Sequence, residues 1–175
     1  MAEFNDNLWA PWRMEYIRSL NEEAKEAGGC FLCRYFEKPE DDRKNHVVWR
    51  GTTAFVVMNR FPYNNGHLMI AVGRHAGNPA DLTEEELTEM TRLSFTGAEL
   101  LTRAVRAVGC NIGTNVGRCA GAGLPDHLHT HVVPRWDGDT NYMAVLGGVR
   151  VVPDSLDATY KQLVRAAVEM GLRDE

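Results

Sequence analysis

Three histidines alternate with single residues in the segment HLHTHVV, which occupies positions 127–133. Alternate side chains of a β-strand lie on one face, so a strand over 127–134 would place the imidazoles of His127, His129 and His131 together. Side-chain packing rarely accounts for three histidines in this arrangement. Two kinds of chemistry do account for it: three nitrogen ligands for a metal ion, or a nucleophile with acid–base partners acting on a phosphate.

A glycine-rich segment lies directly before the histidines. Gly117, Gly121 and Gly123 fall between Asn115 and Asp126, and such a loop brings backbone N–H groups around an anion without net positive charge. The segment lacks the Gly-Lys-Ser/Thr of a Walker loop, and it is not a dinucleotide-binding fingerprint. Together with the histidines it indicates chemistry on a phosphate.

Two of the four cysteines, Cys30 and Cys33, are separated by two residues. The first twenty residues are charged and aromatic and lack the apolar core of a signal peptide, and no apolar run approaches the length of a membrane span. We therefore expect a cytoplasmic protein whose thiols stay reduced. In that setting Cys30 and Cys33 are interpreted as half of a metal site or as a redox pair, and not as a disulfide framework.

The composition is that of one globular domain. The chain has 175 residues, of which 44% are hydrophobic and 25% charged, which excludes a disordered chain, a collagen-like repeat and a disulfide-dense mini-protein. Its formal net charge of −5 argues against a nucleic-acid polymer or an anionic membrane as partner, because an excess of Lys and Arg binds those surfaces. A small site lined by backbone amides is compatible with that charge.

Hydrophobic patterning predicts the elements that must position these residues. Thr83 and Glu86 form a capping-box pattern at the start of a long helix over 84–108, which we expect to end at Gly109. The polar stretch 37–45 is expected to be a surface loop. The other predicted elements are a loosely helical segment over 9–27, strands over 47–49, 54–58, 67–72, 110–115, 127–134 and 149–152, and a last helix from a cap at Asp154 or Ser155 to Met170. This order predicts an α+β fold, a mostly antiparallel sheet with a long helix and flanking helices.

These residues resemble the histidine-triad (HIT) superfamily of nucleotide hydrolases and transferases, whose signature alternates three histidines with apolar residues. Positions 127–133 match it except at Thr130, which would lie on the opposite face of the strand. Residues 58–68, MNRFPYNNGHL, are similar to the nucleoside-pocket segment of the family. The flanks 8–14 and 134–141 resemble a bacterial branch similar to diadenosine tetraphosphate phosphorylases. The resemblance implies a single domain with a HIT-like fold, made of an N-terminal extension over 1–45, a HIT core over 46–136 and a C-terminal extension over 137–175.

The resemblance implies a double displacement on a dinucleoside polyphosphate. His129 would attack the α-phosphorus and form a covalent nucleotidyl-imidazole, with its other ring nitrogen held by a backbone carbonyl. His131 would contact phosphate oxygens and assist the leaving group, and His67 and His127 would complete the catalytic cluster. Orthophosphate or water would then release the nucleotide. The implied substrate-binding residues are Asn59 for the ribose hydroxyls, and Asn115, Gly121 and Gly123 for the phosphates.

The resemblance also implies a zinc site. In zinc-bearing relatives the third ligand lies eight residues after the Gly-His of the pocket strand, as His75 follows His67 here, and the fourth is the first histidine of the triad. Cys30, Cys33, His75 and His127 would then hold a structural zinc ion with no open position for metal-activated water. The reaction itself would need no cofactor.

Several alternatives stay open from the sequence. Within the same family the chain could be a nucleotide hydrolase or a nucleoside phosphoramidase. Outside it, a metal-dependent β-protein could use His127, His129 and His131 as ligands, and a non-catalytic module could simply bind a nucleotide. The implied partners are a small nucleotide, orthophosphate or water, and further copies of the chain in a homodimer or higher oligomer.

Overall fold

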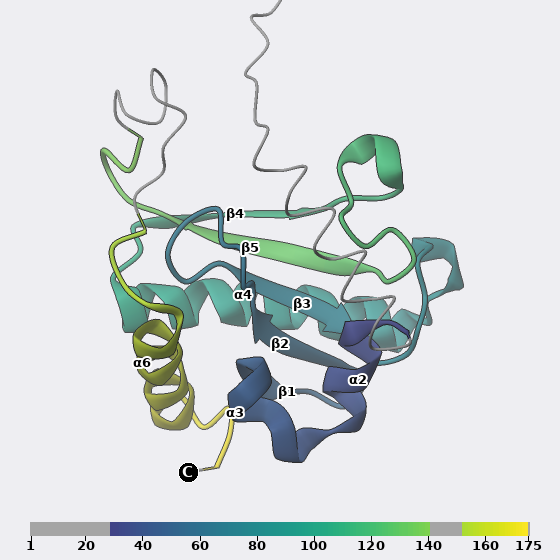
Figure 1. The fold of residues 1–175 in the computed structure, drawn as a ribbon, viewed down its shortest axis with the longest axis horizontal. Coiled ribbons are helices and arrows are strands. Elements are labelled where there is room, and N and C mark those ends of the chain that lie inside the picture. The colour runs from purple at the N-terminus through teal and green to yellow at the C-terminus, as the bar shows by residue number, and fades with distance from the viewer. Residues whose placement is uncertain (1–28, 141–151, 175) are drawn as a thin grey trace, which may run out of the picture.

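The computed structural model describes residues 29–140 and 152–174 (Figure 1). Within them, a five-stranded antiparallel sheet has the order β1-β2-β3-β5-β4. The strands are β1 (Val47–Arg50), β2 (Ala54–Met58), β3 (Leu68–Val72), β4 (Gly109–Thr114) and β5 (His129–Arg135). The α-helices are α2 (Phe31–Glu37), α3 (Asp42–Asn45), α4 (Glu84–Val105) and α6 (Leu156–Glu169), and the 3-10 helices are η1 (Pro39–Asp41), η2 (Pro79–Asp81) and η3 (Arg118–Ala120). The predicted α+β class is confirmed.

Strands β2 and β3 are buried on both faces. Val56 and Ile70 belong to the core that α4 and α6 cover, whereas Val57 and Met69 belong to a smaller core under α2. Burial on both sides explains why these strands are continuous apolar runs and not alternating patterns. In Figure 1, α4 runs across the sheet behind it, α2 lies in front, and α6 packs beside α4 and β1.

Helix α4 begins as predicted and ends earlier than predicted. The Thr83 hydroxyl accepts the N–H of Glu86, and the Glu86 carboxylate accepts the N–H of Thr83, which confirms the capping box. The helix ends at Val105 because Arg106 adopts a left-handed conformation, with φ of 55°, and turns the chain. Gly109 is therefore not the helix stop; it is the first residue of β4.

Three further differences from the expectation concern segments around the predicted site and the stretch before β1. The stretch 37–45 is not a loop: Pro39 opens η1, where its fixed φ suits the first turn, and α3 follows. Strand β5 begins at His129, so His127 lies before the strand. Strand β3 begins at Leu68, so His67 lies before that strand too. His67 and His127, each expected as the first residue of a strand, therefore lie just outside the hydrogen-bonded sheet.

The last helix matches its predicted start. Ser155, and not Asp154, caps α6, because its hydroxyl accepts the N–H of Ala158 at 3.2 Å. The predicted helical segment over 9–27 lies outside the described residues, as do positions 149–151 of the last predicted strand, and Val152 is not in a strand. Among the described residues, no helix combines the length and apolarity needed to cross a membrane.

Candidate active site and metal centre

Antiparallel pairing of β3 with β5 gathers three of the predicted catalytic histidines. Ala71 pairs with His129 and Met69 with His131, and His67 directly precedes β3. The ring centroids of His129 and His131 lie 4.9 Å apart, and those of His67 and His131 lie 5.0 Å apart. His67, more than sixty positions earlier in the chain, thereby joins the two histidines of β5.

The environment of His129 selects one of its two tautomers. Its Nδ1 lies 2.8 Å from the backbone carbonyl oxygen of His127. Because a carbonyl oxygen only accepts hydrogen bonds, Nδ1 carries the proton and Nε2 keeps a lone pair. Burial lowers the pKa of His129 and outweighs the opposing effect of that hydrogen bond, so the ring is neutral near pH 7. His129 therefore presents an unprotonated Nε2, the form that a nucleophile requires.

A second tautomer follows from the contacts of His67. The side-chain oxygen of Asn59 accepts the N–H of Phe61 at 2.9 Å, which turns the amide nitrogen of Asn59 toward His67 Nδ1 at 3.3 Å. The N–H of Tyr63 also points at His67 Nδ1, at 3.2 Å. With two donors facing it, Nδ1 is the acceptor, so the proton of His67 is on Nε2.

The proton of His67 in turn orients His131. His67 Nε2 lies 2.9 Å from His131 Nδ1, so His131 Nδ1 accepts and the neutral ring of His131 carries its proton on Nε2. Burial, and then the neighbouring His131 and His129, lower the pKa of His67 to about 3. His67 thus stays neutral at physiological pH, and its hydrogen-bond direction does not reverse.

The predicted phosphate-binding loop follows β4. Asn115 is half-buried at its start, and Gly117 and Gly121 have positive φ values of 81° and 87°, which favour glycine. The N–H of Gly121 donates to the carbonyl of Arg118 at 3.0 Å. This amide is therefore used within η3, and an anion contact through it would require that bond to open. Gly123 lies in the turn that leads into His127.

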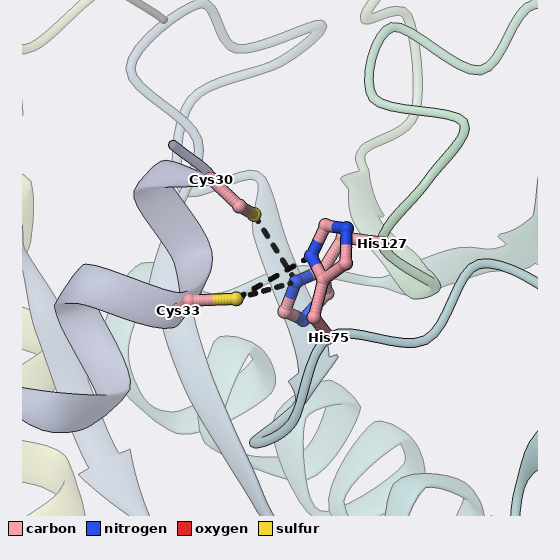
Figure 2. Close-up of side chains that lie close together, drawn as sticks. All are labelled: Cys30, Cys33, His75 and His127. Atoms are coloured by element: carbon pink, nitrogen blue, oxygen red, sulfur yellow. Dashed lines mark hydrogen bonds between the residues drawn. The ribbon is translucent and has the colours of Figure 1, made fainter. Parts of the chain in front are cut away.

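A second cluster joins two cysteines and two histidines (Figure 2). The ligand atoms of Cys30, Cys33, His75 and His127 all lie within 4.8 Å of one another. Cys30 Sγ lies 3.2 Å from His127 Nδ1, and Cys33 Sγ lies 3.5 Å from the Nδ1 atoms of both His75 and His127. A tetrahedral zinc ion with its usual bond lengths separates a sulfur and a nitrogen ligand by about 3.5 Å. The donor set and its spacing fit a metal ion.

The protonation chemistry of this cluster also fits a cation. His127 Nε2 lies 2.7 Å from the carbonyl oxygen of Val72, so Nε2 carries the proton and Nδ1 directs its lone pair at the cysteines. Burial and the adjacent Cys30 raise the pKa of Cys33 to about 11. A divalent cation between the two sulfurs would offset that repulsion and favour both thiolates.

A close approach of two segments brings His75 to His127. The N–H of Leu128 donates to the carbonyl of Ala76 at 2.7 Å. At the next position a Cβ on Gly77 would lie only 2.7 Å from the carbonyl oxygen of Pro125. Only glycine permits this spacing without a shift of the backbone. Nothing in the sequence around Gly77 indicated that role.

His127 connects the two clusters. Its backbone carbonyl holds Nδ1 of His129, and its own Nδ1 faces the cysteines. Among the described residues, the ligand atoms close enough to share a metal ion belong to the cysteine–histidine cluster and not to the three histidines of the alternative. Nδ1 of His127 faces the cysteines and its Nε2 bonds the carbonyl of Val72, so neither nitrogen is directed at a site shared with His129 and His131.

Sequence reasoning missed a polar network beside the site. The carboxylate of Asp139 accepts hydrogen bonds from Asn64, Arg135 and the backbone of Trp136. Asn64 and Asp139 lie within two segments singled out for their resemblance, but no role was assigned to either. The remaining histidine, His46, belongs to neither cluster, and its Nε2 lies 3.2 Å from a carboxylate oxygen of Asp157.

The comparisons with known proteins agree on one family. Residues 40–138 match the family model described as HIT domain. The chain is 37% identical over 163 residues to a protein named AP-4-A phosphorylase from Mycobacterium tuberculosis, a match that covers 89% of this chain and 81% of that protein. It is 28% identical over 95 residues to an asymmetrical bis(5'-nucleosyl)-tetraphosphatase from Schizosaccharomyces pombe, covering 54% of this chain and 52% of that one.

Solved structures share the fold. A zinc-bound histidine triad family protein from Mycobacterium smegmatis superposes with a TM-score of 0.62 at 23% identity, covering 81% of this chain and 95% of that one. A hypothetical histidine triad nucleotide-binding protein from Sulfolobus tokodaii gives 0.63 at 23% identity, covering 80% and 90%. At this identity the likeness concerns the fold alone.

Proposed function

Because this chain belongs to the HIT domain family, we propose that it cleaves dinucleoside polyphosphates through a nucleotidyl intermediate on His129, as a diadenosine tetraphosphate phosphorylase. The observation that carries the proposal is the 2.8 Å contact between His129 Nδ1 and the His127 carbonyl, because it leaves Nε2 as the nucleophile. The name of the M. tuberculosis relative supports the choice of substrate.

The first half-reaction uses the tautomers of His129 and His131. Nε2 of His129 attacks the α-phosphorus; the new P–N bond forms as the P–O bond to the leaving nucleoside polyphosphate breaks. The N–H at Nε2 of His131 donates a hydrogen bond to the departing oxygen, which leaves as a phosphate anion, and the N–H of His67 keeps the other nitrogen of His131 an acceptor. Burial lowers the pKa of His129 and so keeps the nucleophile unprotonated before attack.

The second half-reaction returns His129 to its starting state. An oxygen of orthophosphate attacks the phosphorus, the P–N bond breaks, and the nucleotide leaves with one phosphate more. Diadenosine tetraphosphate and orthophosphate thus become ATP and ADP. With water as the second nucleophile, the same intermediate would release AMP, which is the hydrolase alternative.

Substrate contacts are proposed on both sides of the histidines. The side-chain oxygen of Asn59 accepts the N–H of Phe61, and its amide nitrogen donates one hydrogen to His67. The second lone pair of the oxygen and the second hydrogen of the nitrogen would bind the ribose hydroxyls. Asn115 and the amide of Gly123 hold the phosphates, with Gly121 shaping the turn between them. Backbone amides stabilise the charge on the phosphoryl oxygens in the transition state.

We further infer that Cys30, Cys33, His75 and His127 bind a structural zinc ion. Two thiolates and two imidazoles are a ligand set that zinc favours. With four protein ligands, zinc has no open position for water or substrate, so its role would be structural. It would hold the start of α2, at Cys30 and Cys33, against the loop before β5. His127 would then be fixed through its side chain while its carbonyl orients the nucleophile.

The proposed assembly is a homodimer or higher oligomer in the cytoplasm. Within the described residues, β4 is one of the two edge strands of the sheet, and Val108 and Ile112, beside and on it, are 70% and 39% exposed. An open strand with apolar side chains is a ready surface for a second copy. Sedimentation equilibrium should give a mass of at least twice 19.6 kDa and a smaller mass for Ile112→Lys. A monomeric wild-type protein at micromolar concentration would contradict the assembly.

The decisive assay incubates the protein with diadenosine tetraphosphate, with and without orthophosphate. We expect phosphate-dependent release of ADP and ATP, an adenylyl adduct on the intact protein, and neither in His129→Ala. Phosphate-independent release of AMP would instead identify a hydrolase. Turnover confined to an AMP-amine would identify a phosphoramidase, and binding of nucleotide without any adduct would identify a binding module.

A further inference from the structure

The carboxylate of Asp139 ties together two segments that are far apart in the sequence. Its Oδ1 accepts a hydrogen bond from Arg135 Nη2 at 2.7 Å, and its Oδ2 accepts a second from Arg135 Nε. Oδ2 also accepts the N–H of Trp136 at 3.2 Å and the side-chain amide of Asn64 at 3.2 Å. Arg135 holds the pKa of Asp139 well below its usual range, so the acceptor stays ionised.

Asn64 is held from both sides. Its amide nitrogen donates one hydrogen to Asp139 and the other to the backbone carbonyl of Pro134 at 3.0 Å. Both hydrogens of this amide are therefore directed to the end of β5 and the turn that follows it. The Asp139 side chain is only 11% exposed, although its partner Arg135 is 44% exposed. The Asn64 contact thus lies on the sheltered side of an exposed ion pair.

The turn anchored in this way is the one that sets the tautomer of His67. The backbone carbonyl of Asn64 accepts the N–H of His67 at 3.1 Å. The residue before it, Tyr63, directs its N–H at His67 Nδ1, and the Tyr63 ring lies 4.7 Å from that of His67. A shift of Asn64 would move the donor that keeps Nδ1 of His67 unprotonated.

We propose that Asp139 is a positioning residue for the reaction: through Asn64 it holds the turn over 61–66 so that His67 keeps its proton on Nε2 and His131 keeps its proton toward the leaving group. The proposal rests on the proposed function for its effect on rate, but its effect on the tautomer of His67 is independent of any substrate. Asp139 touches neither the nucleophile nor the reacting atoms.

The test is Asp139→Asn in the full-length, metal-loaded protein. The variant keeps the shape of the side chain but loses the charge that pairs with Arg135, and it presents an amide to the amide of Asn64. We expect nitrogen-15 NMR of the imidazoles to show His67 Nε2 protonated in the wild type and a mixture of tautomers in the variant. We expect kcat on diadenosine tetraphosphate to fall about tenfold while KM changes less than about twofold.

Two further variants separate positioning from simple loss of structure. Asp42→Asn is the matched control, because Asp42 also accepts two hydrogen bonds from one arginine, Arg50, and its side chain is 18% exposed. This variant should leave both the tautomer of His67 and kcat unchanged. Asn64→Ala should reproduce the effect of Asp139→Asn, and the double variant should be no slower than Asn64→Ala alone.

Two results would overturn the proposal. One is a folded Asp139→Asn protein in which His67 keeps the wild-type tautomer, whatever happens to the rate. The other is additive losses of kcat in the double variant. If Asp139→Asn fails to fold, Asn64→Ala carries the same two readouts. A protein that turns over no dinucleoside polyphosphate would count against the proposed function, while the tautomer measurement would still decide the role of Asp139.

Discussion

At the scale of single residues, the site depends on which nitrogen of each imidazole carries the proton. A carbonyl selects Nδ1–H in His129, and two donors select Nε2–H in His67. These two choices leave a lone pair on the proposed nucleophile and a proton on the side of His131 that does not face His67. Residue identity alone does not decide this, because every neutral histidine has both tautomers available.

The pKa of His67 predicts a pH dependence of stability. Its folded pKa of about 3 lies below the value of 6.5 that it has in the unfolded chain, so the unfolded state binds the extra proton between those values. The free energy of unfolding should therefore fall as pH drops from about 6.5, by up to about 1.4 kcal/mol per pH unit from this group. Urea titrations from pH 8.5 to 4.5 measure the slope.

His67→Asn provides the comparison for that measurement. Above about pH 7 neither state of the wild type binds the proton at His67, so the stability curves of the two proteins should run parallel there. Below it, the curve of the variant should be flatter. Equal slopes in the acid range would show that burial of His67 does not contribute to acid sensitivity.

At the scale of elements, α4 does more than cover the sheet. The carboxylate of Glu89 accepts the backbone N–H groups of Thr52, Thr53 and Ala54 and the hydroxyl of Thr53. Burial opposes the ionisation of Glu89, but these hydrogen bonds outweigh it and lower its pKa. The turn between β1 and β2 is thus fastened to the helix, at the opposite end of β2 from Asn59.

Substitution of Glu89 tests this fastening. Glu89→Gln cannot accept all of these hydrogen bonds and should lower the free energy of unfolding by about 2 kcal/mol. We expect kcat to stay unchanged, because the Glu89 carboxylate bonds the turn and Arg92 and none of the catalytic histidines. The matched control is Glu99→Gln, which removes an exposed pair with Arg103 and should cost less than about 1 kcal/mol. A large loss of kcat in Glu89→Gln would show that the turn and the site are coupled.

At the scale of the whole molecule, the metal cluster joins three parts of the chain. Cys30 and Cys33 belong to the start of α2, His75 follows β3, and His127 precedes β5. A bound ion would hold α2 on the face of the sheet opposite α4. Because the ion would bind the folded state and not the unfolded chain, its binding would raise the free energy of unfolding.

Metal analysis and thermal unfolding test this role. We expect one zinc ion per chain, its loss in Cys33→Ser, and a fall in melting temperature on the order of 5 °C or more after chelation. His129→Ala should retain the metal, since that residue is outside the cluster. A metal that leaves with His129 and stays in Cys33→Ser would support the three-histidine site instead.

The sequence alone determined the chemistry-bearing residues and the family that they resemble. Alternation of histidines, a cysteine pair and glycine spacing are local patterns, and the capping box of α4 and the cap of α6 are equally local, so each can be recognised in a short window. The five described strands also followed from local apolar runs, with errors of at most two residues at their ends. Val152, the described residue of the sixth expected strand, is not in a strand.

The tertiary structure decided what depends on contacts between distant segments. It placed His127 before the strand, with its carbonyl on the nucleophile and its side chain among the cysteines. It also revealed the approach of Gly77 to Pro125 and the bond of Asp139 to Asn64. The physical reason is that a metal ligand set, a close backbone approach or a buried acceptor depends on a partner that lies tens of residues away. A local pattern carries no record of that partner. The tautomers of His129 and His67 depend on partners only two to eight residues away, but the contacts form only in the backbone conformation that the folded chain adopts there.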